Sequence, residues 1–478
     1  MNIHTTIPAL WLLLLIVRAF AQNAPASPDH PSHFAGEQQI EGAAKPFLES
    51  RFSLESGRTY SLAELVNLAE EHNPEAQVAW ENARAQMAAL GVARSELYPT
   101  VAAAALSQTN RSEALFSSQF DRQTVQSFGG AFDLNYTIFD SGGRAGRIDA
   151  ARAELFAANF AFNDTHRRII YQVTEAYDRL LNAAGQVEAA RASLKNAQAV
   201  QQAAEDRLKN GLATLPDVLE ARSAGAQAQY DLQATLGAEE NTRSDLATAL
   251  GTRPTDAIQV QPLDQVVIPE SIDDSVDQAM DHAFEQRPDL MQQVAEIRKA
   301  NASVKEARAA FYPALTVSAS PNAQSVYGLQ QQLPWAHTAD LAGSFELKLH
   351  WTLFDGGARK NSLAQAQANL RAAEARVKVA QDNIADEVWR AYSNLETSLE
   401  QRQAASALLT AADQSYAATL ESYNDGVRNF LDVTAAQTTL ARARSADVLA
   451  RTQVLSNLAE LVFETGELIQ SNAGRPKP

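Results

Sequence analysis

The stretch that decides the fold is residues 128–144, FGGAFDLNYTIFDSGGR, which has a counterpart in residues 345–359, FELKLHWTLFDGGAR. In both, apolar and polar side chains alternate. One face of the first carries Phe128, Phe132, Leu134, Tyr136 and Ile138, and one face of the second carries Phe345, Leu347, Leu349, Trp351 and Leu353. Alternation over about ten residues is typical of a membrane-spanning β-strand with a lipid face and a wet face. The alternative is a soluble antiparallel sheet with one buried face.

Each stretch ends in a Phe-Asp-x-Gly turn, and a long helical pattern follows. No proline occurs from 100 to 215 or from 335 to 475, and residues 144–209 are rich in strong helix formers. Such a helix would be about 100 Å long and would need partners along its length. Asn210-Gly211 predicts a left-handed stop and Pro216 a new first turn, so we expect a helical hairpin. The second half repeats it, with a tip at Asp425-Gly426.

Upstream of each strand, prolines predict two further helix ends. A helix over 61–72 should end at Asn73-Pro74 and a second near Leu97, because the residue before proline is disfavoured in the α region. We expect β-hairpins over about 99–140 and 313–355, with 110–126 and 321–340 as loops. Four strands cannot close a barrel, and lipid does not tolerate an open sheet edge. The membrane interpretation therefore requires several chains.

The chain is an internal duplication. At offsets of 214 and 215, Tyr98-Pro99 matches Tyr312-Pro313, Gly142 matches Gly357 and Gly211 matches Gly426. We predict a first repeat over 59–251, a linker over 252–272, a second repeat over 273–467 and a tail over 468–478. The apolar run 8–17 and Ala19-Phe20-Ala21 predict a signal peptide over 1–21, with an uncleaved anchor as the alternative. Residues 22–58 read as a flexible arm.

Composition argues against several classes of protein. Lys plus Arg total 40 and Asp plus Glu total 57, for a net charge of −17, which argues against a nucleic-acid partner. The absence of cysteine removes disulfides, thiolate metal sites and a lipidated cysteine. The eight histidines show no metal-binding spacing, and no Walker or GxSxG motif occurs. We therefore expect no enzyme activity, no cofactor and no metal.

Together, the duplication, the Asn-Pro break, the Tyr-Pro exits, the Phe-Asp-x-Gly turns and the two tips resemble the TolC family of outer-membrane efflux proteins. The resemblance covers about 58 to 466. It implies an α+β membrane protein: a TolC-like homotrimer with a twelve-stranded β-barrel, four strands per chain, that continues into a long periplasmic α-helical barrel. A mixed belt, midway along the helices, would take the short helices and the linker.

The same resemblance implies a function. The chain would be the outer-membrane exit duct of a tripartite efflux pump for small molecules, with a periplasmic adaptor and an inner-membrane RND or ABC transporter as partners. An outer-membrane component of a type I protein secretion system is the alternative. A periplasmic coiled-coil scaffold without a channel is a more remote one.

The resemblance also assigns residues. Asp432 would form a ring of three carboxylates at the constriction, and Arg428, one turn earlier, matches a position that helps hold the tip closed. The pair could equally be a solvated i,i+4 ion pair, and a second acidic ring is in doubt because Ala435 stands in its place. Asp217 is either a lumen residue or a helix-start carboxylate. The adaptor would dock on the tips at Gly211, Leu212, Gly426 and Val427. The expected structural turns are Tyr98, Pro99, Asp140, Gly142, Tyr312, Pro313, Asp355 and Gly357, with Arg144 and Arg359 beside them.

Overall fold

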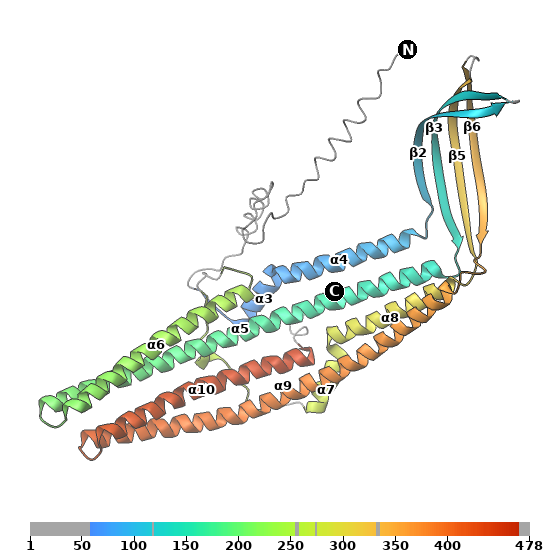
Figure 1. The fold of residues 1–478 in the computed structure, drawn as a ribbon. Helices are drawn as coiled ribbons and strands as arrows, with labels where there is room; N and C mark the ends of the chain where they lie inside the picture. The colour runs from blue at the N-terminus through green and yellow to red at the C-terminus, as the bar shows by residue number, and fades with distance from the viewer. Residues whose placement is uncertain (1–57, 117–118, 254–257, 273–274, 331–334, 468–478) are drawn as a thin grey trace, which may run out of the picture.

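A computed structural model describes residues 58–116, 119–253, 258–272, 275–330 and 335–467. The expected signal peptide, the tail 468–478 and the N-terminal arm, apart from Arg58, lie outside the described residues. Long helices run from a four-stranded sheet at one end of the molecule to two hairpin tips at the other (Figure 1).

The short helices start and stop at the residues that the sequence indicates. Helix α3 (Leu62–His72) begins with a capping box, in which Ser61 N–H donates to Glu64 Oε2 at 2.9 Å. Asn73 ends α3, and its Oδ1 accepts from Glu75 N–H at 2.8 Å, so that α4 (Pro74–Ser95) begins at once. The second half repeats this pair as α7 (Val276–Gln286) and α8 (Pro288–Ala309).

The two long hairpins are present as predicted. Helices α5 (Gly143–Lys209) and α9 (Ala358–Asn424) each have 67 residues. They begin after Gly142 and Gly357, whose φ angles of +94° and +92° lie in the left-handed region that glycine adopts readily. Helices α6 (Leu215–Ala249) and α10 (Phe430–Thr465) return antiparallel to α5 and α9 (Figure 1).

The sheet joins the two halves. Its strands are β2 (Thr100–Phe116), β3 (Gln119–Phe139), β5 (Ala314–Gln330) and β6 (Ala336–His350), antiparallel in the order β2-β3-β5-β6. The register places apolar residues opposite one another, in a row of Val101, Leu134, Ala319 and Phe345. The next row on the other face is polar, with Asn135, Ser318 and Glu346. The sheet therefore has one apolar and one polar face.

The strands are longer than predicted, and the prediction of loops over 110–126 and 321–340 was wrong for most of these residues. Asn110 pairs with Val125, and Pro321 pairs with Gly343. In the outer parts of the strands, apolar residues such as Val125 and Leu329 stand among polar ones without a sustained alternation, so the pattern does not mark these segments, although their backbone groups still pair. The last strand also ends early, at His350, and the Trp351 indole N–H donates to Phe311 O at 3.1 Å.

The helices form a layer with a consistent order. Near the sheet, α5 lies between α4 and α8, and α9 lies beyond α8; towards the tips, α5 lies between α6 and α10, with α9 beyond α10. Helices α5 and α8 approach so closely at Gly146 that an added Cβ atom there would lie only 2.9 Å from Glu306 N. None of the described helices is both long enough and apolar enough to cross a bilayer.

Midway along the helices, the linker folds against the layer. Strand β1 (Thr59–Tyr60) pairs parallel with β4 (Gln259–Val260), and a 3₁₀ turn, η2 (Leu263–Gln265), follows. Arg287, which is buried, donates to Asp289, Glu387 and Glu464, at 2.7, 2.7 and 2.6 Å. This one side chain connects α8, α9 and α10. Burial raises the pKa of Glu464 to about 7.

Candidate functional site: the paired hairpin tips

The first tip, between α5 and α6, is built by local backbone chemistry. Gly211 has φ +75°, and Leu212 N–H donates back to Arg207 O at 2.8 Å, which satisfies a carbonyl at the end of α5. Helix α6 restarts with Pro216 in its first turn. Asp217 Oδ2 accepts from the Thr214 N–H at 2.9 Å and from its hydroxyl at 2.8 Å. Asp217 therefore acts as a helix-start carboxylate within this chain.

The second tip, between α9 and α10, has the same construction. Gly426 has φ +81°, and Val427 N–H donates to Ser422 O at 2.9 Å. Asn429 caps α10 by accepting from Asp432 N–H at 2.8 Å. Both predicted tip glycines therefore lie at left-handed turns.

A side chain from the first tip holds the second. The Arg207 guanidinium donates to Tyr423 O at 2.7 Å and to Asn424 O at 3.3 Å, and it lies 4.5 Å from the centre of the Tyr423 ring. Tyr423 is buried and packs edge-on against Phe430, and burial raises its pKa. The duplication did not reveal Arg207 as a site residue, because the position that matches it is Ser422. That difference between the halves is the signal that could have found it.

Arg428 and Asp432 lie together one turn apart. Their nearest nitrogen and oxygen are 3.5 Å apart, and the side chains are 59% and 36% exposed. Within one chain this is the solvated ion pair that the sequence left open as an alternative. Neither side chain is buried in this chain, so both can contact a neighbouring copy of the chain.

The tips expose apolar side chains at the end of the molecule. Leu212 and Val427 are 68% and 79% exposed, and Leu215 and Leu431 are also exposed. An apolar patch on a monomer surface is typical of a site that binds another protein. Among the described residues, no group of three or more His, Asp or Glu side chains could hold a metal ion.

At the other end of the helices, the predicted turn residues lie where strands and helices meet. Tyr98 and Tyr312 are exposed and end short turns, and the Ser141 hydroxyl donates to Pro313 O at 3.0 Å. Asp140 and Asp355 accept from the N–H groups of Arg144 and Arg359 at 2.5 and 3.0 Å. The Arg144 guanidinium donates to Glu96 O and Ile138 O, which supports the structural role expected of it.

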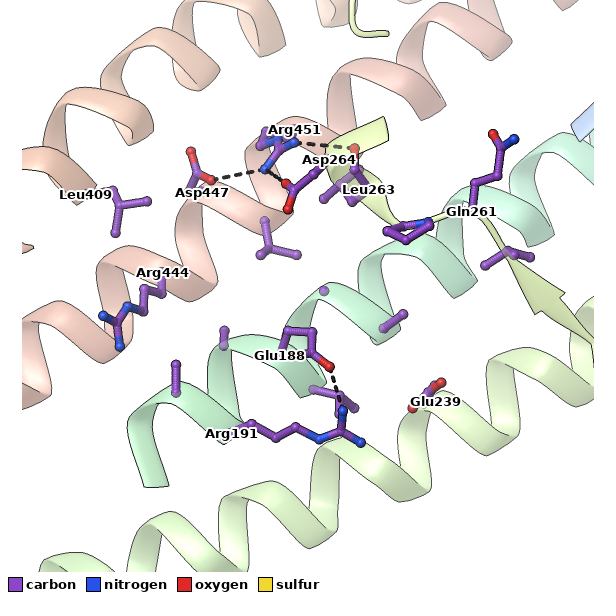
Figure 2. A pocket seen from close by; sticks show the side chains of 18 residues that line it. Glu188, Arg191, Glu239, Gln261, Leu263, Asp264, Leu409, Arg444, Asp447 and Arg451 are labelled. Atoms are coloured by element: carbon purple, nitrogen blue, oxygen red, sulfur yellow. Dashed lines mark hydrogen bonds and ion pairs between the residues drawn. The ribbon is translucent and has the colours of Figure 1, made fainter. Parts of the chain in front are cut away.

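A hollow of about 450 Å³ lies between α5, α10 and the linker. Figure 2 shows Arg451 turned towards Asp264 and Asp447, with nitrogen–oxygen distances of 2.9 and 3.8 Å. Glu188 and Arg191 pair at 2.6 Å in the same view. Arg451 lies on α10 and Asp264 on the linker, so this ion pair holds the linker against α10, whereas Glu188 and Arg191 pair within α5.

A family model for outer membrane efflux proteins matches residues 65–252 and 279–467, which is most of the chain and both copies of the duplication. The chain belongs to the outer membrane efflux protein family. The predicted family and the TolC-like fold, with four strands per chain and an internal duplication, are thereby confirmed. Members of this family are channel-forming outer-membrane proteins, so the predicted location and the efflux-channel function are confirmed as well.

Known proteins similar to the chain agree with this assignment. It is 28% identical to protein CyaE of Bordetella pertussis, over 87% of this chain and 86% of CyaE. It is 24% identical to outer membrane protein OprJ of Pseudomonas aeruginosa, over 85% and 83%. The solved structure of the outer-membrane channel OprN has the same fold, with a TM-score of 0.74 at 20% identity, over 93% of this chain and 98% of OprN.

Proposed function

We propose that three copies of this outer membrane efflux protein close into one conduit that carries small molecules out of the cell. The observation that carries the proposal is the pair of open edges. Strands β2 and β6 are the two ends of the sheet; β2 follows α4, and β6 precedes α9. One edge of the molecule is therefore α6, α4 and β2, and the other is α9 and β6 (Figure 1).

These edges complement each other in a head-to-tail ring. Unpaired backbone groups at a sheet edge are costly in lipid, so β2 of one copy has to pair with β6 of the next. Large apolar side chains are exposed on both edge helices, including Trp80 and Met87 on α4 and Val379 and Trp389 on α9. A heterologous contact of this kind gives a closed ring when its rotation closes. The family resemblance selects three copies.

The tips are the proposed docking site for a periplasmic adaptor. Leu212 and Val427 are exposed beside left-handed glycine turns, so an apolar partner surface could cover both hairpins together. We propose that the chain has no catalytic role, because its sequence shows no nucleotide-binding or hydrolase motif. Energy for transport would then come from an inner-membrane transporter that the adaptor connects to the duct.

Asp432 is the proposed constriction residue. In a three-fold ring, three copies would place three carboxylates around the narrow end, which attracts cations and repels anions. Arg428 would lower that charge by pairing with its own Asp432, 3.5 Å away.

Site-specific photo-crosslinking tests the assembly and the docking site separately. A probe at Trp80 on α4 should capture α9 of a sibling chain and give products no larger than a trimer. Probes at Leu212 and Val427 should capture one periplasmic adaptor. Siblings alone at the tips would remove the docking proposal and leave the ring intact. Failure of the Trp80 probe to capture α9 would contradict the ring.

A further inference from the structure

A second cavity lies on the other side of the linker. Its volume is about 690 Å³, and α3, α5, α10 and the linker line it. Most of the wall is apolar, including Leu62, Val66, Ile170, Leu455 and Val462. Val267, also in the wall, is 90% exposed, so the cavity opens to solvent there. Its volume is within the range of small-molecule sites, about 300–1,000 Å³.

Among the described residues, one ionisable side chain in this wall lacks a hydrogen-bond partner. Asp178, on α5, is only 4% exposed, and its Oδ2 accepts no hydrogen bond from any described residue. The neighbouring hydroxyls are already engaged: that of Thr174 donates to Ile170 O at 2.8 Å, and that of Ser61 donates to Glu64 Oε2 at 3.1 Å. Burying a carboxylate without a partner is costly. A ligand that donates to this oxygen would remove that cost.

We propose that this cavity binds small organic ammonium ions, with the ammonium group donating to Asp178 and the hydrocarbon part lying against the apolar wall. The cavity is formed within one chain, and the proposed duct does not require Asp178. A hard divalent metal ion fits the same wall poorly, because it requires about six oxygen ligands. The ammonium ion instead needs one strong acceptor and an apolar surface.

The electrostatic surroundings favour a cation. Burial raises the pKa of Asp178 to about 7, and the negative charge of Glu175, three residues earlier on α5, adds to this shift. On α10, the pKa of Glu460 is also raised, chiefly by burial. Asp178 is therefore largely ionised at pH 8 and largely protonated at pH 5.5. The affinity for an ammonium ion should therefore increase with the fraction of Asp178 that is ionised.

Titration calorimetry of the full-length protein in detergent tests the proposal, with 2-phenylethylammonium chloride as the probe and 2-phenylethanol as its uncharged counterpart. At pH 8 the wild type should bind the ammonium ion at least about tenfold more tightly than the alcohol. Asp178→Asn should abolish that preference. Asp245→Asn, which removes the same charge from an exposed position on α6, should retain it.

The pH dependence gives a second test that needs no variant. Wild-type affinity for the ammonium ion should fall at least about fivefold from pH 8 to pH 5.5, since the probe keeps its charge while Asp178 loses its own. Equal affinity for the two probes, binding that is unchanged in Asp178→Asn, or no binding to the wild type would each overturn the proposal. If the variant does not fold, the pH series on the wild type decides.

Discussion

The Arg207 guanidinium lies 4.5 Å from the centre of the Tyr423 ring and donates to the Tyr423 carbonyl oxygen at 2.7 Å. Arg207 lies at the end of α5 and Tyr423 at the end of α9, so one side chain connects the tips of the two hairpins. The contact combines a charge-assisted hydrogen bond with a cation–π interaction. The contact is therefore placed to limit how far the tips separate.

Replacing this arginine should loosen the tips. We expect Arg207→Ala to remove about 1–3 kcal/mol of stabilisation at the tip, because the bond to Tyr423 O is lost and the ring is uncovered. The chain has no native cysteine, so spin labels can be placed at Leu212→Cys and Val427→Cys alone. Electron–electron distance measurements on spin-diluted protein should show a broader and longer distribution in the variant.

Lys209→Ala is the matched control for this experiment. Lys209 is exposed, and its ion pair is with Asp206 in the same helix, at 2.9 Å. Removing it deletes a positive charge two residues from Arg207 without touching the other hairpin. If it broadens the distances as much as Arg207→Ala does, local charge rather than the Tyr423 contact controls the tips.

Charge at the constriction should set ion preference. Asp432→Asn should lower the permeability ratio of potassium to chloride by about fivefold. The reason is that a carboxylate about 4 Å from a permeating potassium ion stabilises it by about 1 kcal/mol in water, which corresponds to a factor of about five. Arg428→Ala should shift the ratio the other way, because it leaves Asp432 unpaired. Reversal potentials under a salt gradient measure both. Equal ratios in the two variants and the wild type would place Asp432 outside the conduit.

Replacing two helical glycines by alanine should change stability in opposite directions. Gly146→Ala would bring a Cβ atom to 2.9 Å from Glu306 N, in the backbone of α8, and should destabilise by about 1–3 kcal/mol. Gly237 lies within α6, and apart from the local backbone of α6 no described atom would lie within 4 Å of the added Cβ. Gly237→Ala should therefore stabilise by about 0.5–1 kcal/mol. Thermal unfolding of both variants, followed by circular dichroism, checks the signs.

Asp178 should make stability depend on pH. Burial raises its pKa in the folded chain from 3.8 to about 7, so the folded state binds a proton that the unfolded state releases between these pH values. Its unfavourable contribution therefore grows as pH rises from about 3.8 to about 7 and stays constant above that range. At pH 8, Asp178→Asn should raise the melting temperature by a few degrees, about 2–4 °C per kcal/mol.

The same substitution should raise the melting temperature less at pH 5, because pH 5 is closer to the unfolded pKa of 3.8 and protonating the aspartate on folding costs less there. Asp245→Asn, at an exposed site, should show no such difference between the two pH values. A melting temperature for Asp178→Asn that lies below the wild type at pH 8 would mean that the carboxylate makes a favourable contact when the protein is folded.

Prolines and glycines that end helices or make turns explain how much of the fold the sequence predicts. Pro74, Gly142 and Gly211 each force one backbone outcome, and the structure places a helix break or a left-handed turn at every one of them. The duplication then predicts the second half from the first. The sequence did not predict the outer parts of the strands because paired residues there, such as Arg111 and Thr124, do not continue the alternation of apolar and polar side chains.

The parts of the site that the sequence does not predict depend on long-range contacts. Arg207 and Tyr423 are 216 residues apart, and the repeat has no equivalent of Arg207, so no local pattern pairs them. Asp178 resembles any polar residue on a long helix until α3, α10 and the linker cover it. The tip glycines could be located, but the side chain that joins the tips could not.

Single-channel recording in planar bilayers tests the central claim, that this chain forms a conduit restricted at its tips. Purified wild-type protein should give a small, cation-preferring conductance, and Arg207→Ala combined with Asp432→Asn should give a severalfold larger conductance with less cation preference. If the wild type and the double variant both fail to pass ions while remaining assembled in the bilayer, the protein is not a channel gated at these residues.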